Sequence, residues 1–175
     1  MAIDESRTFV PLHIALLTVS DTRTPDDDTS GDILADCIET AGHALVHRAI
    51  VADDADLLEI TLREWIADES VDAIISTGGT GLTGRDVTPE ALDRVKTKNI
   101  PGFGELFRWV SYETIGTSTM QSRACAALAD DTYIFALPGS NGAVKDGWGR
   151  ILAEQLDSRN RPCNFVDLMP RLRER

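Results

Sequence analysis

The stretch DAIISTGGTGLTGRDVTPE, residues 72–90, decides how this chain folds. It opens with a short β-branched apolar run, residues 72–77, of the kind that buried strands use. Four glycines follow within the seven residues 78–84, and Thr88-Pro89-Glu90 is typical of a helix start. Because glycine lets backbone N–H groups approach a ligand closely and adopt positive φ, such a loop suits an oxyanion such as phosphate.

Two familiar phosphate-binding motifs do not fit this loop. Residues 79–84, GTGLTG, satisfy the pattern GxGxxG, but a dinucleotide-binding fold opens its helix inside that motif. Here Arg85, Asp86 and Val87 come between the motif and Thr88. A Walker loop requires GK[ST] after its last glycine, and this chain offers Gly84 followed by Arg85 and Asp86. The bland alternative, a flexible surface loop without a ligand, stays open.

Composition narrows the class of protein. With 175 residues and 42% hydrophobic content, the chain is long enough for one core of normal size. Its net charge of −12 argues against nucleic acid or an anionic membrane as partner. Three widely spaced cysteines, an acidic start and no run approaching the roughly 20 apolar residues of a membrane span together predict a cytoplasmic protein.

Apolar periodicity predicts strands that alternate with helices. The predicted strands cover residues 12–19, 43–51, 72–77 and 132–137. The predicted helices cover residues 31–41, 89–95, 102–114, 120–128 and 143–156, and one more runs from its cap at residue 53 or 54 with residues 58, 61, 62, 65 and 66 on its inner face. Gly42 ends the first helix, Asp53 or Asp54 caps the second, and Thr88 caps the third. The alternation indicates an α/β fold with three layers, in which a doubly wound, mostly parallel sheet carries helices on both faces.

Polar residues gather where ligands bind in such sheets, at the carboxyl ends of the strands. Asp53 and Asp86 are the candidates for catalysis and for metal binding, because two carboxylates that reach one phosphate site would hold Mg²⁺. Asp53 as a helix cap and Asp86 as a support of its own loop are the alternatives. The candidate ligand contacts are Ser20, Asp21, Thr22, Gly78, Gly79, Thr80, Gly81, Thr83, Ser122, Pro138, Gly139, Ser140 and Asn141.

Several blocks together resemble the signature of the MoaB/MogA family of molybdenum cofactor biosynthesis, and they follow the family order across nearly the whole chain. These blocks are TGGTG (77–81), RDVTPE (85–90), IPGFGE (100–105), Ser122-Arg123 and LPGS (137–140). The acidic loop DDDTSG (26–31), GTST (116–119) and the segment RNRPCNF (159–165) resemble the MoaB branch of that family in particular.

The resemblance implies a single molybdopterin-binding domain over residues 1–175, with a C-terminal tail from about residue 158. In active members the domain adenylylates molybdopterin with Mg-ATP, which would make this chain a molybdopterin adenylyltransferase with Mg²⁺ as cofactor. The family's essential aspartates match Asp53 and Asp86. The rival function is a molybdopterin-binding carrier or assembly subunit without transferase activity, because catalytic competence is not assured across the MoaB branch.

The same resemblance implies a homo-oligomer, a trimer or a hexamer, with other molybdenum cofactor biosynthesis proteins as further partners. The sequence adds an aromatic segment with Phe103, Phe107, Trp109 and Tyr112, which supplies more apolar surface than one small core requires. Burial of these aromatic side chains within the monomer is the alternative.

Overall fold

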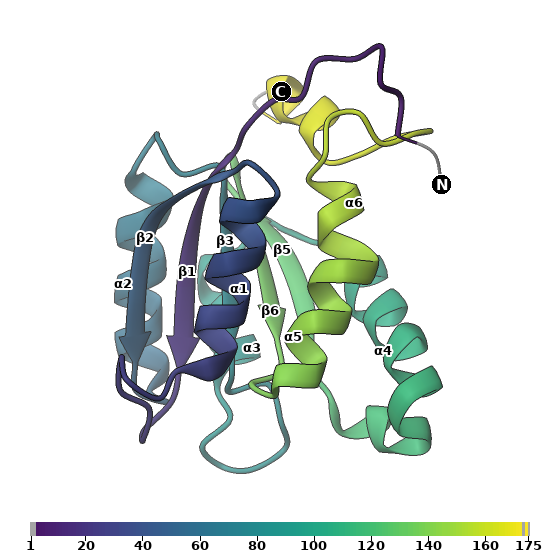
Figure 1. Cartoon of the computed structure of the whole chain (residues 1–175). Coiled ribbons are helices and arrows are strands. Elements are labelled where there is room, and N and C mark those ends of the chain that lie inside the picture. Colours follow the sequence, from purple (N-terminus) through teal and green to yellow (C-terminus); the bar gives the residue numbers. More distant parts are fainter. Residues whose placement is uncertain (1–2, 173, 175) are drawn as a thin grey trace.

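Six strands form one sheet in the middle of the computed structural model, which describes residues 3–172 and 174 (Figure 1). The strands are β1 (His13–Val19), β2 (Ala44–Val51), β3 (Ala73–Thr77), β4 (Lys98–Asn99), β5 (Cys125–Ala129) and β6 (Thr132–Leu137). Their order is β2-β1-β3-β6-β5-β4. The first four in this order run parallel, while β5 is antiparallel to β6 and β4 is antiparallel to β5. The predicted α/β fold with a mostly parallel sheet is confirmed.

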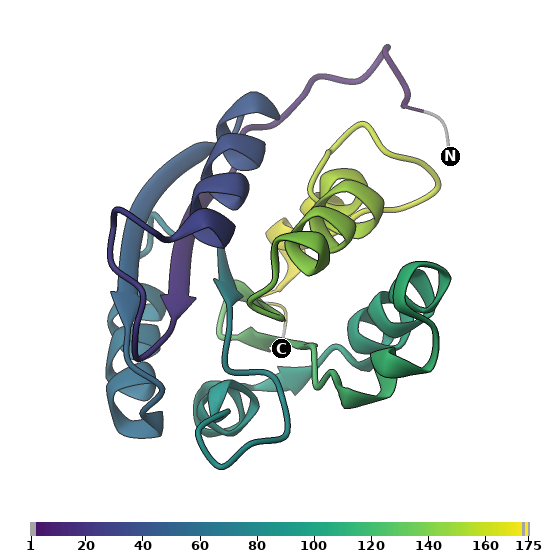
Figure 2. The ribbon, with the colours of Figure 1, turned by 60° about the horizontal axis from the view of Figure 1, so that its bottom comes forward.

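Helices cover both faces of the sheet, as Figure 2 shows for α1 and α2 on opposite sides. The α-helices are α1 (Thr29–Thr40), α2 (Ala55–Ala67), α3 (Thr88–Val95), α4 (Pro101–Ile115), α5 (Asn141–Gly147) and α6 (Ala153–Gln155). A 3-10 helix, η1 (Gly116–Gln121), follows α4, a π-helical segment, η2 (Trp148–Leu152), joins α5 to α6, and η3 (Val166–Arg171) is a 3-10 helix. Among the described residues, no helix combines the length and the apolarity that crossing a bilayer requires.

Alternation along the buried strands divides the core into two halves. Ile14 and Leu16 of β1 pack on the side of α1, α4 and α5, whereas Ala15 and Leu17 pack on the side of α2 and α3. All four residues are at most 1% exposed. Successive side chains of a strand point to opposite faces, so a strand covered on both sides must be apolar throughout. The sheet is therefore doubly wound, with one hydrophobic cluster on each face.

The prediction of a helix over residues 120–128 is wrong. Residues 116–121 form η1, and residues 125–129 form β5, which pairs with β6 through a tight turn where Asp130 has φ 51°. Alanine favours helix in isolation, and this segment reads Ala124 to Ala129 with four alanines, so local propensity pointed the wrong way. The small side chains instead fit a strand buried on both faces, and the pairing with β6 overrides the propensity.

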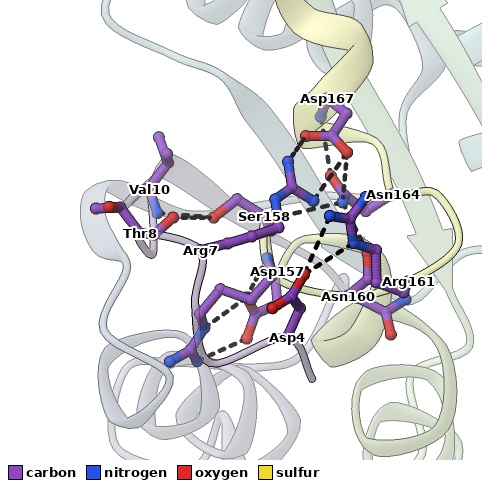
Figure 3. A network of polar contacts seen from close by, with 11 residues as sticks. Asp4, Arg7, Thr8, Val10, Asp157, Ser158, Asn160, Arg161, Asn164 and Asp167 are labelled. Carbon is purple, nitrogen blue, oxygen red and sulfur yellow. Dashed lines mark hydrogen bonds and ion pairs between the residues drawn. The ribbon is translucent and has the colours of Figure 1, made fainter. Parts of the chain in front are cut away.

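The chain termini are joined by polar contacts, which Figure 3 shows. The Arg161 guanidinium donates to Asp4 Oδ2 from Nε at 3.1 Å and from Nη2 at 3.0 Å, and Arg7 Nη1 donates to Asp167 Oδ2 at 3.1 Å. The Ser158 hydroxyl bonds two backbone groups of the N-terminal segment. In the region predicted as a tail, Val166 is part of the core, and Met169 and Leu172 pack against it. Residues 1, 2, 173 and 175, at the ends of the predicted domain and tail, lie outside the described residues.

Asp28 fixes the start of α1 against the sheet. Its carboxylate is 0% exposed and accepts from Gly31 N at 3.0 Å, from Thr18 Oγ1 of β1 at 2.8 Å and from Arg48 Nη2 of β2 at 3.0 Å. A Cβ at Gly31 would lie 2.0 Å from Asp28 Oδ2, so the carboxylate occupies the space that a side chain at this position would need. One buried carboxylate thus connects α1, β1 and β2.

We expect Asp28→Ala to lower the free energy of unfolding by about 3 kcal/mol, because it removes a cap and leaves Arg48 without its buried partner. Urea denaturation monitored by circular dichroism measures the change. Asp32→Ala is the matched control, since Asp32 also pairs with Arg48, at 2.7 Å, but its side chain is 55% exposed. Equal losses in the two variants would contradict the role of the buried carboxylate.

Candidate functional site

The loops after β1, β2, β3 and β6 lie at one edge of the sheet, which Figure 2 brings forward. β1 lies between β2 and β3, so the chain leaves β1 through α1 on one face and reaches β3 through α2 on the other. The point where the winding reverses opens a crevice between neighbouring loops, and ligands of parallel α/β sheets bind there. The predicted site residues all follow or border these strand ends.

The glycine loop starts with two residues of positive φ, Gly78 at 105° and Gly79 at 63°. Gly78 N donates to the Leu137 carbonyl of β6 at 2.9 Å, and a Cβ at Gly78 would lie 2.1 Å from the carbonyl oxygen of Val19. A Cβ at Gly139 would lie 3.2 Å from the Gly78 Cα. The ends of β1, β3 and β6 thus touch backbone to backbone, which only residues without a Cβ permit.

Arg123 holds the loop closed from the inside. Its Nε donates to the Gly81 carbonyl at 2.6 Å, its Nη2 donates to the Asp86 carbonyl at 2.7 Å, and its Nη1 pairs with Glu90. Because its three guanidinium nitrogens all bond these oxygens, Arg123 stabilises the conformation of the loop. The loop is therefore an ordered structure, unlike the flexible loop that the sequence left open.

The predicted helix cap at Thr88 is wrong. Thr88 is the first residue of α3, Val87 holds the cap position, and no side chain caps this helix. The Thr88 hydroxyl instead donates to the Gly78 carbonyl at 2.9 Å, and its backbone N–H donates to the Gly79 carbonyl at 3.0 Å. Thr88 thus provides hydrogen bonds to the carbonyls of Gly78 and Gly79, the two loop residues of positive φ.

A cavity of about 510 Å³ opens beside the glycine loop. Nine of the predicted residues line it: Gly78, Gly79, Thr80, Gly81, Asp86, Ser122, Pro138, Gly139 and Ser140. Its other wall comes from α4, η1 and α5, which sequence reasoning did not assign to the site. The residues of that wall are Phe107, Ser111, Thr114, Ile115, Ser118, Thr119, Gln121, Gly142, Ala143 and Asp146. Two sequence signals fell on this wall, and neither predicted a place in the site: the block 116–119 carried family resemblance, and Phe107 belonged to the aromatic segment.

Six predicted residues lie outside the cavity lining: Ser20, Asp21, Thr22, Asp53, Thr83 and Asn141. Ser20 Oγ accepts from the backbone N–H groups of Thr22 and Arg23, which shapes the turn after β1. The Thr29 hydroxyl donates to Asn141 Oδ1 at 3.0 Å and joins the start of α1 to the start of α5. These contacts place Ser20, Thr22 and Asn141 in the framework of the crevice.

Asp53 does not cap a helix. The cap of α2 is Asp54, whose Oδ1 accepts from Asp56 N at 2.9 Å and from Leu57 N at 3.0 Å. Asp53 lies against the glycine loop instead, and a Cβ at Gly79 would stand 2.8 Å from Asp53 Oδ1. Burial raises the pKa of Asp53, and the negative charges of Asp21 and Asp86 raise it further. The ionised carboxylate is therefore held where it is disfavoured, as is common for functional groups.

Asp86 faces the same loop from its other end. A Cβ at Gly81 would lie 2.8 Å from Asp86 Oδ2, and that oxygen accepts from Thr83 Oγ1 at 2.6 Å and from Thr83 N at 2.8 Å. The hydrogen bond from the Thr83 hydroxyl is the main reason that the pKa of Asp86 is lowered. Asp86 is thus a fixed, ionised carboxylate at the rim of the cavity.

These two carboxylates fit a magnesium ion that also takes ligands from a substrate. Within residues 3–172 and 174, no group of three or more His, Cys, Asp and Glu side chains is placed to hold a metal by itself. Mg²⁺ prefers oxygen ligands and is commonly held by one or two carboxylates together with substrate phosphates. The donors here are all oxygen, and the mutual repulsion of Asp53 and Asp86 is what a cation would relieve.

Known proteins resemble this chain over most of its length. The model of a family described as a probable molybdopterin binding domain matches residues 15–158. Molybdenum cofactor biosynthesis protein B of Escherichia coli K12 is 49% identical over 160 residues, which cover 91% of this chain and 94% of that protein.

Solved structures agree with the sequence comparison. A crystal structure of molybdenum cofactor biosynthesis protein B superposes with a TM-score of 0.86 at 34% identity, covering 97% of this chain and all of that chain. The structure of the molybdopterin biosynthesis enzyme MoaB from Thermus thermophilus gives 0.72 at 29% identity, covering 81% of this chain and 89% of that one.

We expect Gly78→Ala to lower the free energy of unfolding by about 2 kcal/mol or more, because the new Cβ meets a backbone carbonyl at positive φ. Thermal and urea unfolding measure the loss. Gly84→Ala in the same loop is the control, since a Cβ there meets no atom within 4 Å, and it should melt like the wild-type protein. A Gly78→Ala protein of unchanged stability would show that the backbone contact with Val19 is dispensable.

Proposed function

This chain belongs to the MoaB/MogA family of molybdopterin-binding proteins in molybdenum cofactor biosynthesis, and from that premise we propose that it adenylylates molybdopterin with Mg-ATP. The observation that carries the proposal is the placement of Asp53. It is free of the capping role, which Asp54 fills, and it faces Asp86 across the glycine loop. Burial and the like charges of Asp21 and Asp86 disfavour the ionised form of this carboxylate, and a hydrogen bond from the Asp21 backbone offsets them only in part, which supports a functional role.

The cavity offers two kinds of surface for such a substrate. The glycine loop presents backbone N–H groups together with the hydroxyl of Thr80, which suit a phosphate. The opposite wall adds the apolar side chains of Phe107 and Ile115 from α4, which suit the ring system of a pterin. A volume of about 510 Å³ lies within the usual range for small-molecule sites.

The reaction needs no nucleophilic side chain. The terminal phosphate of molybdopterin is already anionic, so one of its oxygens forms the new bond to the α-phosphorus of ATP while the bond to pyrophosphate breaks. Asp53 and Asp86 would hold Mg²⁺, which supplies neutralisation of the triphosphate and of the leaving pyrophosphate. The loop N–H groups and hydroxyls hold the substrate oxygens in line, so positioning and charge compensation provide the catalysis.

A second candidate function, a molybdopterin carrier without transferase activity, has one observation in its favour. Both hydrogen bonds from Thr83 go to the same oxygen of Asp86, as in an aspartate that stabilises its own loop. A carrier would use the glycine loop for the pterin phosphate and would need neither ATP nor metal.

Asp53→Asn and Asp86→Asn separate the two functions. Under the proposal each lowers the rate of pyrophosphate release from Mg-ATP and molybdopterin by about 100-fold or more, because each removes a group that acts mainly in the transition state. Molybdopterin affinity, followed by fluorescence or calorimetry, should change little. A wild-type protein that binds molybdopterin but releases no pyrophosphate would establish the carrier instead.

Asp54→Asn is the matched control, since Asn caps a helix as well as Asp and the neighbouring carboxylate stays in place. It should leave turnover unchanged. Asp53→Asn should in addition stabilise the fold at neutral pH, because the raised pKa of Asp53 means that ionising it costs folding free energy. This gain should shrink as the pH falls through the raised pKa of Asp53 and vanish well below the ordinary value of 3.8, where the carboxyl is protonated in both states.

We also propose that the protein forms a homo-oligomer, a trimer or a hexamer built from trimers, through the outer face of α4, with other molybdenum cofactor biosynthesis proteins as further partners. Of the aromatic residues in this segment, Phe103 and Phe107 are buried in the monomer, whereas Trp109 is 65% and Tyr112 57% exposed. Leu106, 38% exposed, lies one turn before Trp109. Exposed apolar side chains that cluster on one helix face are typical of an interface.

Light scattering at micromolar concentration should return a multiple of the 19.1 kDa monomer mass. Trp109→Glu should reduce the mass, because a charge would be buried in the interface. Ile60→Glu on α2, where Ile60 is 62% exposed, controls for the charge and should leave the mass unchanged. A monomeric wild-type protein would refute the oligomer without touching the proposed chemistry.

A further inference from the structure

Asp21 connects three of the loops that form the crevice. Arg85 of the glycine loop donates from Nε to Asp21 Oδ2 at 2.8 Å and from Nη2 to Asp21 Oδ1 at 2.6 Å. The backbone N–H of Asp53, in the loop after β2, donates to the same Oδ1 at 3.1 Å. One carboxylate after β1 therefore holds the residue next to Asp86 and the backbone of Asp53 at the same time.

The pair does little for the stability of the fold. The Arg85 side chain is 64% exposed and that of Asp21 is 37% exposed, and exposed ion pairs contribute little to the free energy of unfolding. A bidentate guanidinium–carboxylate contact instead fixes the relative orientation of the two side chains, because both N–H groups must align with both oxygens. A lysine would keep the charge and lose that alignment.

We propose that Asp21 and Arg85 are positioning residues, which fix the candidate catalytic carboxylates Asp53 and Asp86 relative to each other. The inference rests on the proposed adenylylation. Asp86 is already anchored within its loop by Thr83 and Arg123, so its position is set by the glycine loop itself. Asp53 belongs to a different loop. Its carboxylate packs against Gly79, and the hydrogen bonds that tie its backbone to the glycine loop run through Asp21 to Arg85.

Precise spacing matters for this chemistry, since a misplacement of about 1 Å can cost roughly 100-fold in rate. Two carboxylates on separate loops can share a ligand only while the loops keep their separation. The cation of Arg85 also lies near Asp21, Asp53 and Asp54, where it offsets part of the negative charge gathered at the crevice. The Arg85 fork thus combines a geometric link with local charge compensation.

Arg85→Lys tests the geometric part, because it retains the charge. We expect kcat for pyrophosphate release to fall about 10- to 100-fold, with KM for molybdopterin and the melting temperature unchanged. Arg94→Lys is the matched control: Arg94 Nη1 of α3 pairs with Asp56 at 2.6 Å, its side chain is 44% exposed, and it lies outside the cavity lining. Wild-type kcat in Arg85→Lys, with a functioning wild-type enzyme, would overturn the positioning role and leave the proposed function intact.

A double-mutant cycle adds a second measure. Asp21→Ala and Arg85→Lys each break the same contact, so the double variant should lose no more activity than the worse of the two single variants. Losses that multiply would mean that the two residues act separately, and the proposal would fall.

Amide hydrogen exchange distinguishes failure of this inference from failure of the proposed function. The Asp53 amide should exchange several-fold faster in Asp21→Ala and in Arg85→Lys, and at the wild-type rate in Arg94→Lys. This measurement requires neither ATP nor turnover. If the wild-type protein proves inactive, faster exchange of the Asp53 amide still supports the link between the loops, whereas unchanged exchange in both variants refutes it.

Discussion

The structure depends on a backbone contact that only glycine permits. Gly78 lies so close to the Val19 carbonyl and to Gly139 that the ends of β1, β3 and β6 form one continuous backbone surface. The loop that leaves this surface is then closed by Arg123 and Thr88, which bind its carbonyl oxygens. Because those oxygens are occupied from inside the protein, the loop can present N–H groups to the cavity. The shape of the glycine loop thus follows from how the strand ends pack.

Charge explains why the site is built this way. The protein carries a net charge of −12. Two arginines of the glycine-loop region already have acidic or carbonyl partners: Arg85 pairs with Asp21, and Arg123 bonds loop carbonyls and Glu90. Under the proposed function, an anionic substrate would be met by backbone dipoles, by hydroxyls and by a cation that the carboxylates hold. The same reasoning accounts for the position of Asp53, whose ionised form is costly without such a cation. Burial and the like charges of Asp21 and Asp86 disfavour the ionised form of Asp53, which is common among functional groups.

The cavity joins this polar loop to a wall that belongs to a different layer of the fold. Phe107 and Ile115 come from α4, and Ser118 and Thr119 from η1, both of which lie beyond the central parallel strands. A ligand with a phosphate at one end and a ring system at the other would match both parts. This division agrees with membership in a molybdopterin-binding family.

Local patterns in the sequence determined the α/β class, the glycine loop and the candidates Asp53 and Asp86, because β-branched runs, glycine clusters and polar strand ends act over a few residues. Local patterns failed where the conformation depends on residues far away in the sequence. The alanine-rich segment forms β5 because it pairs with β6. Which of Asp53 and Asp54 caps α2 depended on packing against the glycine loop. Asp21 and Arg85 are 64 positions apart, and Arg123 and Asp86 are 37 apart. Such contacts, like the wall from α4 and η1, exist only once the sheet has brought its loops together, so tertiary structure alone decided which of the predicted residues share a cavity and which support it.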